Sequence, residues 1–88
     1  MNLAFTKKFL KQVSKLNNPV LAKEIILIID EAEKAQTLSE IKNLKKLKGH
    51  NNYYRIRTGD YRIGIYFNKD SFEFAAIDHR KDIYKYFP

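Results

Sequence analysis

The 88-residue chain has no cysteine and only two histidines. It therefore contains no disulfide and no thiolate metal ligand, and two histidines are too few for a typical structural zinc site. We expect neither a metal nor a small-molecule cofactor. No run of about 18 apolar residues is present to span a membrane, and the first residues lack the apolar core of a secretory signal. These absences fit a cytoplasmic protein.

Positive charge is what the sequence has in excess, with 17 Lys and Arg against 10 Asp and Glu, a net charge of +7. Residues 1–42 hold seven basic and five acidic side chains (+2), and residues 43–88 hold ten and five (+5). The excess either forms a solvated surface that keeps a small domain soluble, or marks a site for a polyanion.

The first half of the chain predicts a strand and a helical hairpin in one domain spanning residues 1–88. Asn2–Phe5 reads as a strand, and Thr6 is placed to cap a first helix. The break at residues 17–19 begins a second helix. Its apolar stripe consists of Leu21, Ile25, Ile28 and Ala32, widened by Ile26 and Ile29. Because this leaves no second long apolar face, we expect a monomer.

The second half predicts three strands. Residues 37–40 have capping-box spacing and indicate one more helical turn. Four residues are expected to anchor this connector in the core: Leu38, Ile41, Leu44 and Leu47. Strands follow at residues 53–57, 61–67 and 71–77, joined by short turns at 58–60 and 68–70. Links this short favour an antiparallel meander, and the tail, residues 78–88, has room for one or two helical turns. The fold class is therefore α+β, with the helices on one face of the sheet.

Alternation along these strands separates an apolar face from a basic one. The predicted apolar face contains Tyr61, Ile63, Ile65, Phe67, Phe72, Phe74 and Ala76. The opposite face is left with Tyr53, Arg55, Arg57, Arg62, Gly64 and Tyr66. One interpretation is that the three arginines extend separately into solvent and are partly neutralised by Glu73 and Asp60. The other is that the arginines bind phosphates. Arginine suits phosphate because its planar fork donates in pairs and stays charged.

Tyrosines near these arginines favour RNA as the partner. Bases of single-stranded RNA stack on aromatic rings, which are supplied here by Tyr53, Tyr66, Tyr84 and Tyr86. An acidic protein partner remains open.

The tail adds side chains able to move protons. If it turns back over the sheet, His79, Arg80 and Tyr84 can join the arginines. RNA cleavage by its own 2′-hydroxyl needs a base, a cation for the phosphorane and an acid, and arginine supplies only the cation. His79 is the natural acid or base, ahead of Lys48, His50 and Tyr84. The alternatives are a surface or capping role for His79, and a tail that Tyr84 anchors together with Ile83 and Phe87.

Four segments in order give the chain a family resemblance: L-K-G at 47–49, Y-R-I-R at 54–57, G-D-Y-R at 59–62 and H-R-K-D-I-Y at 79–84. Over nearly its whole length it resembles the RelE/ParE superfamily of toxins, especially the RelE branch. The resemblance implies a RelE-like fold and a microbial cytosolic toxin of a type II toxin–antitoxin system. Such a toxin cuts mRNA in the ribosomal A site without a metal, leaves a 2′,3′-cyclic phosphate type of end, and is blocked by a RelB-like antitoxin.

The resemblance also implies roles for individual residues. Arg62 matches an arginine that contacts the phosphate and the transition state, Arg80 matches the basic residue after the last strand, and Tyr84 matches a tail tyrosine. The expected catalytic residues are Arg57, Arg62, His79, Arg80 and Tyr84. The expected RNA-binding residues are Lys48, His50, Tyr53, Arg55 and Tyr66.

Three points stay open. Some members have lysine where this chain has Arg55 and Arg57, so the general base is undecided between His79 and Lys48. The ParE branch shares the fold but inhibits DNA gyrase. A degenerate toxin that only binds its antitoxin is the third possibility.

Overall fold

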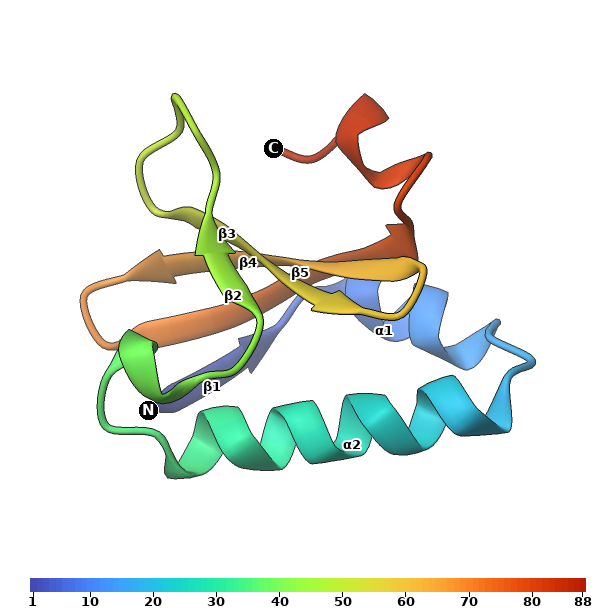
Figure 1. Ribbon diagram of the computed structural model, residues 1–88, viewed down its shortest axis with the longest axis horizontal. Coiled ribbons are helices and arrows are strands. Elements are labelled where there is room, and N and C mark those ends of the chain that lie inside the picture. The colour runs from blue at the N-terminus through green and yellow to red at the C-terminus, as the bar shows by residue number, and fades with distance from the viewer.

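The computed structural model describes all 88 residues as two α-helices, a five-stranded sheet and two short 3₁₀ turns (Figure 1). In chain order these are β1 (Asn2–Phe5), α1 (Lys7–Ser14), α2 (Pro19–Lys34), η1 (Leu38–Glu40), β2 (Leu44–Lys46), β3 (Tyr53–Thr58), β4 (Tyr61–Asn68), β5 (Ser71–His79) and η2 (Ile83–Lys85). The α+β prediction is confirmed. None of these helices has the length and apolar character needed to cross a bilayer.

The helices begin where the capping residues predict. The Thr6 Oγ1 accepts a hydrogen bond from the Phe9 backbone N–H (3.0 Å), and Asn18 Oδ1 accepts one from Leu21 N–H (3.1 Å). Each bond satisfies a donor that the first helical turn leaves free. At η1, the carboxylate of its last residue, Glu40, accepts a hydrogen bond from the backbone N–H of the N-cap Thr37 (2.9 Å). The predicted helical turn at 37–40 is therefore confirmed.

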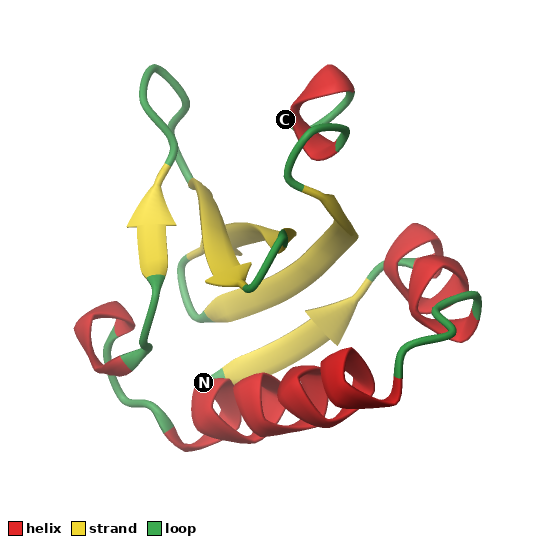
Figure 2. Cartoon of the chain, turned by 45° about the vertical axis from the view of Figure 1, so that its right-hand side comes forward, coloured by secondary structure: helices red, strands yellow, loops and turns green.

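The strand order is β1-β5-β4-β3-β2. β3, β4 and β5 form the predicted antiparallel meander, and β1 joins it in parallel to β5. β2 was not predicted. It is a three-residue edge strand that pairs antiparallel with β3, and only its Leu44 is half-buried. Figure 2 shows α1 and α2 on one side of the sheet and the C-terminal turn on the other.

The main core lies between the helices and the sheet. Ile63, Ile65, Phe72 and Phe74 are completely buried in it, together with Phe9 from α1. The predicted inward face of β4 is thus confirmed.

The predicted stripe on α2 is too wide. Ile26, which was included in the stripe, is 66% exposed. Two other apolar residues of α2 are also exposed, Val20 (72%) and Leu27 (62%). A continuous apolar run does not show which of its residues turn outward. Val20 and Leu27 line a groove between α2 and the β3–β4 hairpin, whereas Ile26 lies outside this groove. The expected monomer stays a prediction.

The predicted inward face of β5 is correct for Phe72 and Phe74 but wrong for Ala76. Gly64 pairs with Ala76, whereas Ile65 pairs with Phe74, so Ala75 has no partner on β4. This β-bulge reverses the alternation. Ala76 is therefore buried on the opposite face, away from Phe72 and Phe74.

A second, smaller cluster on that opposite face holds the C-terminal tail. Ala76, Ile83 and Phe87 are its buried members, and Leu47, expected in the main core, packs against it. Gly64 makes the docking possible: a Cβ at this position would lie 2.7 Å from the Phe87 ring, inside van der Waals contact. The tail therefore does turn back over the sheet.

Candidate nucleic-acid interface

Four arginines gather on the tail-covered face at one end of the β3–β4 hairpin, and we call them the arginine cluster: Arg55, Arg57, Arg62 and Arg80. Arg57 and Arg62 are direct cross-strand partners. Arg80 follows β5, and its backbone N–H donates to the Asp60 carbonyl in the hairpin turn (2.8 Å). Like charges directly opposite each other on neighbouring strands destabilise a sheet. Folding alone does not favour this arrangement.

Backbone carbonyls hold two of these guanidinium groups in place. The Nη1 of Arg62 donates to the Gly59 and Tyr61 carbonyls, both at 2.9 Å, and Arg55 Nη1 donates to the Asn43 carbonyl at 2.9 Å. Gly59 has φ of +59°, which a glycine adopts readily in a tight hairpin turn. Each fork keeps its Nε and Nη2 donors free of protein partners, so a phosphate can bind to them.

The electrostatics of Arg62 show how crowded the cluster is. Burial lowers the pKa of Arg62, Tyr84 opposes this, and the nearby charges of Arg55, Arg57 and Arg80 lower the pKa further. Arginine nevertheless stays protonated at neutral pH. The three arginines and Tyr84 are therefore close enough to Arg62 to affect its charge.

Little negative charge compensates the cluster. Only one carboxylate pairs with it, Asp60, whose Oδ1 lies 4.0 Å from the Nε of an exposed Arg80. Such an exposed pair contributes at most about 1 kcal/mol. Glu73 is the cross-strand partner of Tyr66, beyond the bulge, and makes no ion pair. The expectation that Glu73 neutralises an arginine is wrong, and an anionic ligand would relieve the repulsion.

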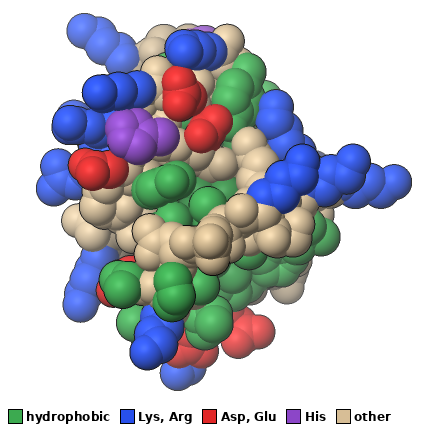
Figure 3. Space-filling model, turned by 90° about the vertical axis from the view of Figure 1, so that its right-hand side faces the viewer, with side chains coloured by type: hydrophobic (Ala, Val, Ile, Leu, Met, Phe, Trp, Pro, Cys, Tyr) green, Lys and Arg blue, Asp and Glu red, His purple; other side chains and the backbone are tan.

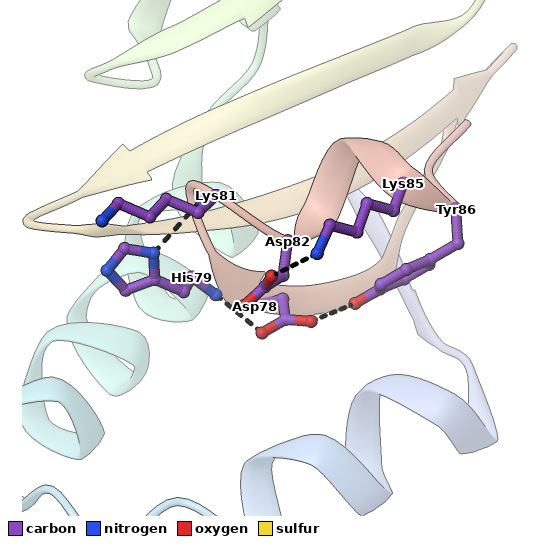
Figure 4. A network of polar contacts seen from close by, with 6 residues as sticks. All are labelled: Asp78, His79, Lys81, Asp82, Lys85 and Tyr86. Carbon is purple, nitrogen blue, oxygen red and sulfur yellow. Dashed lines mark hydrogen bonds and ion pairs between the residues drawn. The ribbon is translucent and has the colours of Figure 1, made fainter.

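A hydrogen-bonded clamp at Tyr86 fixes the tail that carries Tyr84 (Figure 4). The Tyr86 hydroxyl donates to Asp78 Oδ2 (3.0 Å) and accepts from Gln12 Nε2 (2.8 Å). Gln12 Oε1 in turn accepts the Ile77 backbone N–H (2.8 Å). Burial raises the pKa of Tyr86, the Gln12 bond lowers it, and Asp78 raises it. The clamp ties η2 to both α1 and β5.

His79 lies at the end of β5, beside Arg80, with its ring on the helix-covered side of the sheet. It is the β-partner of Tyr61, and the two rings meet edge to face at 5.8 Å on the helix-covered side. Its Nδ1 accepts the Lys81 backbone N–H (3.1 Å), and Figure 4 shows the ring at the far end of the network from Tyr86. Arg62 pairs instead with Asp78, whose side chain points to the opposite face. The register therefore directs His79 away from the face that carries Arg62, although its neighbour Arg80 and its partner Tyr61 line the same groove as Arg62. The catalytic role of His79 stays a prediction.

The remaining predicted RNA-binding residues form a separate group at the other end of the hairpin. The Tyr53 and Tyr66 rings meet across the strands in a tilted arrangement with centroids 5.1 Å apart, and the His50 ring meets Tyr53 edge to face at 6.3 Å. Lys48 is exposed in the preceding loop. Phe87 contacts Tyr53 at 5.6 Å and covers Gly64, so it lies between this aromatic group and the arginine cluster.

Two features of the site were missed from the sequence. One is a groove between α2 and the β3–β4 hairpin, lined by Val20, Leu27, Glu24, Arg57, Arg62 and Arg80 among others. The other is the Tyr86 clamp, which joins residues 12, 78 and 86. Helical periodicity gave no sign of either, because both depend on how the tail and α2 meet the sheet.

Comparisons with known proteins agree on one family, although no protein-family model matches the chain. Toxin RelE3 of Methanocaldococcus jannaschii is 45% identical over 89 residues, covering the whole of both chains. A chain of the RelB–RelE antitoxin–toxin complex from Methanococcus jannaschii is 44% identical, with a TM-score of 0.82 over 97% of this chain and 99% of that one.

More distant structures share the fold. A chain of the archaeal RelE–RelB complex from Pyrococcus horikoshii OT3 superposes with a TM-score of 0.73 at 21% identity, over 92% of this chain and 96% of that one. The isolated E. coli RelE toxin gives 0.65 at 20% identity, over 96% and 90%.

Proposed function

This chain belongs to the RelE family of toxins, and we propose that it is an endoribonuclease that cuts mRNA in the ribosomal A site. The observation that carries the proposal is that Arg57 lies directly opposite Arg62 and that both line one groove with Arg80, with Asp60 as the one paired carboxylate. A guanidinium cluster with unused donors matches the charge that develops on a scissile phosphate.

The proposed reaction needs the RNA, the arginine cluster and separate groups that accept and donate a proton, because arginine stays protonated. The 2′-oxygen attacks the neighbouring phosphorus as its proton leaves to a base, and a P–O2′ bond forms. The P–O5′ bond then breaks, the 5′-oxygen takes up a proton, and a 2′,3′-cyclic phosphate remains. Arg57, Arg62 and Arg80 stabilise the extra negative charge of the phosphorane.

Tyr84 is the candidate for proton transfer or base stacking within the cluster. Its hydroxyl is close enough to Arg62 to affect the pKa of that residue, and 49% of Tyr84 is exposed. The exposed ring can contact a base, and the hydroxyl can exchange a proton with the substrate. Lys48, His50, Tyr53 and Tyr66 lie farther along the hairpin, where they would contact RNA away from the scissile bond.

The first experiment is primer extension on an mRNA in a reconstituted translation system, with and without ribosomes. Arg62→Ala should lower cleavage about 10²- to 10³-fold, the loss expected when a group that stabilises transition-state charge is removed. Lys23→Ala is the matched control, because it removes an exposed positive charge from α2, outside the cluster.

Each result has a definite meaning. Cuts that need ribosomes and are lost in Arg62→Ala support the proposal, and cuts without ribosomes would make the chain a free ribonuclease. No cuts from a chain that still stops growth would favour a ParE-like gyrase inhibitor, to be tested by DNA supercoiling. A chain that binds an antitoxin without affecting growth would be a degenerate toxin.

We also propose that a RelB-like antitoxin inhibits the chain by lying in the groove between α2 and the hairpin. The relative with 44% identity was solved as a RelB–RelE complex. Exposed Val20 and Leu27 offer apolar contacts in the same groove that Arg62 and Arg80 line. A segment bound there would cover both. Leu27→Asp should therefore weaken antitoxin binding, measured by calorimetry, while primer extension shows unchanged cleavage.

A further inference from the structure

A second basic surface lies on α1, on a different element from the arginine cluster, and we call it the lysine row: Lys7, Lys8, Lys11 and Lys15. All four side chains are exposed. α1 itself contains no Asp or Glu, and the three ion pairs of the molecule involve Lys34, Arg80 and Lys85 instead. The row therefore carries four positive charges without a paired carboxylate.

The stability of α1 does not explain these lysines. Lys7 and Lys8 occupy the first turn, where the helix dipole disfavours positive charge. Lys7 and Lys11, and Lys11 and Lys15, are four residues apart, and like charges at this spacing destabilise a helix by about 0.2 to 0.5 kcal/mol per pair. Lys8 contacts the Tyr86 ring, and Lys11 and Lys15 lie at the C-terminal end of α1, where the helix dipole favours positive charge. The charge of Lys7 in the first turn and the repulsion along the row have no such compensation, which indicates a function outside folding.

The row has a geometry suited to an extended anion. Residues 7, 11 and 15 follow one face of the chain in steps of about 6 Å. Together with Lys8 and Gln12 they line a shallow depression that contains no apolar side chain. Figure 3, seen from the end of the molecule that carries α1, shows Lys and Arg side chains projecting at the right-hand edge, away from the carboxylates near the histidine.

The row is also joined to the proposed active site through the tail. Lys8 Nζ lies 3.7 Å above the centre of the Tyr86 ring, and Gln12 holds the Tyr86 hydroxyl. Tyr86 is two residues from Tyr84, which belongs to the surroundings of Arg62. Lys8 and Gln12 thus connect α1 to the tail that carries Tyr84.

We propose that the lysine row binds the phosphate backbone of ribosomal RNA while the arginine cluster holds the mRNA. The inference rests on the proposed function. It adds a surface through which the chain binds the ribosome at a distance from the mRNA bond that is cut. A folded peptide partner gains affinity by burying apolar side chains, and the depression contains none, its apolar surface being only the methylene stems of its lining residues. A phosphodiester backbone needs only a line of positive charges, because releasing its counterions drives binding.

The test is a salt titration of ribosome binding. Every chain carries Arg62→Ala, so that cleavage does not occur during the measurement. The variant under test is Lys7→Gln/Lys11→Gln/Lys15→Gln, which spares Lys8 and its contact with Tyr86. The control is Lys23→Gln/Lys34→Gln/Lys69→Gln, which removes the same charge from exposed positions on α2 and the β4–β5 turn.

We expect the α1 variant to lower the slope of log K against log salt concentration by about 2 to 3, since each lost phosphate contact contributes about 0.7 to 0.9. The control should change the slope by less than about 1. Equal slopes for the two variants would overturn the proposal, and so would the absence of ribosome binding by the parent chain. Weakened antitoxin binding with unchanged ribosome binding would also overturn it, and would assign the row to a protein partner.

The measurement separates this inference from the proposed function. It reads binding alone, whereas the nuclease activity is read by primer extension with the chain that keeps Arg62. The parent chain could bind ribosomes through the lysine row while the wild-type chain cuts no mRNA. That result would overturn the proposed nuclease activity but would support RNA binding by the lysine row.

Discussion

The two faces of the sheet are built on different physical terms. The helix-covered face is dry and internally consistent: Ile63 and Ile65 are fully buried, and capping bonds from Thr6 and Asn18 begin the helices above them. The tail-covered face places Arg57 directly opposite Arg62 on neighbouring strands. The helix-covered face buries apolar side chains, as folding favours, whereas the tail-covered face places like charges opposite each other, which opposes folding. The difference indicates which face stabilises the domain and which one meets a ligand.

The largest expected effect comes from putting a charge into the helix-covered face. Ile63→Asp should unfold the chain, because a buried carboxylate has no partner there and a domain of this size has little stability to lose. Loss of the far-ultraviolet circular dichroism signal and of cooperative urea unfolding would show this. Ile26→Asp introduces the same charge at a side chain that is 66% exposed and should remain folded. Equal stability of both variants would mean that the inward face has been assigned wrongly.

The helix-covered face is also the part that the sequence predicted well. Alternation along residues 61–67 identifies its inward side, because bulky Ile and Phe residues at every second position fit only a buried sheet face. The prediction of which residues face inward failed in two places: where the side chains of a strand are small, and where a helix is apolar around its whole circumference. Ala75 and Ala76 fit either face, so nothing in their chemistry marks the bulge. The run around Ile26 is apolar throughout, which hides the direction in which each residue points.

The candidate site was predicted in part, for a related reason. Alternation placed Arg55, Arg57 and Arg62 on one face, and the structure keeps them there. The route of the tail depends on contacts across the chain, such as Phe87 over Gly64, which no local pattern encodes. The position of His79 was missed because it depends on the register of β5 after the bulge.

Closing the space above Gly64 should disturb the tail-covered face next. Gly64→Ala puts a methyl group 2.7 Å from the Phe87 ring, so the tail has to move. We expect a loss of about 1 to 3 kcal/mol in the free energy of unfolding, typical of overpacking. Cleavage should fall as well, because Tyr84 is displaced from Arg62. Urea unfolding and primer extension measure the two effects.

Phe87→Ala supplies the matched test of that mechanism. In the double variant Gly64→Ala/Phe87→Ala the aromatic ring is absent, so the new methyl group at position 64 does not clash with residue 87. The two changes should therefore destabilise the chain by less than the sum of the single variants, with a coupling of about 0.5 to 3 kcal/mol. Simple additivity would show that the Gly64 position is not in contact with the tail.

A smaller effect is expected at the clamp. Tyr86→Phe removes the hydroxyl that joins Asp78 and Gln12 and should cost about 1 kcal/mol at neutral pH. Burial and Asp78 raise the pKa of Tyr86 in the folded chain above its unfolded value of about 10. The folded state therefore binds this proton more tightly, and the added stability is present below about pH 10 and lost as the pH rises through the folded pKa. The difference between wild type and Tyr86→Phe in urea unfolding should shrink above about pH 10, and a constant difference across this range would argue against the clamp.

The smallest effect should come from His79, which sequence reasoning placed among the catalytic groups. Its ring packs edge to face on Tyr61, on the helix-covered side, while Arg62 and Asp78 point to the other side. A group that does not face the scissile phosphate cannot exchange protons with it. His79→Gln keeps a side-chain acceptor for the Lys81 N–H and should cleave mRNA within about twofold of wild type, since surface substitutions away from a site rarely exceed about 0.5 kcal/mol. If His79→Gln instead lost activity as severely as Arg62→Ala while remaining folded, the histidine would be the missing acid or base. The catalytic surface would then have to extend around the end of β5, because neither face of the sheet alone contains both groups.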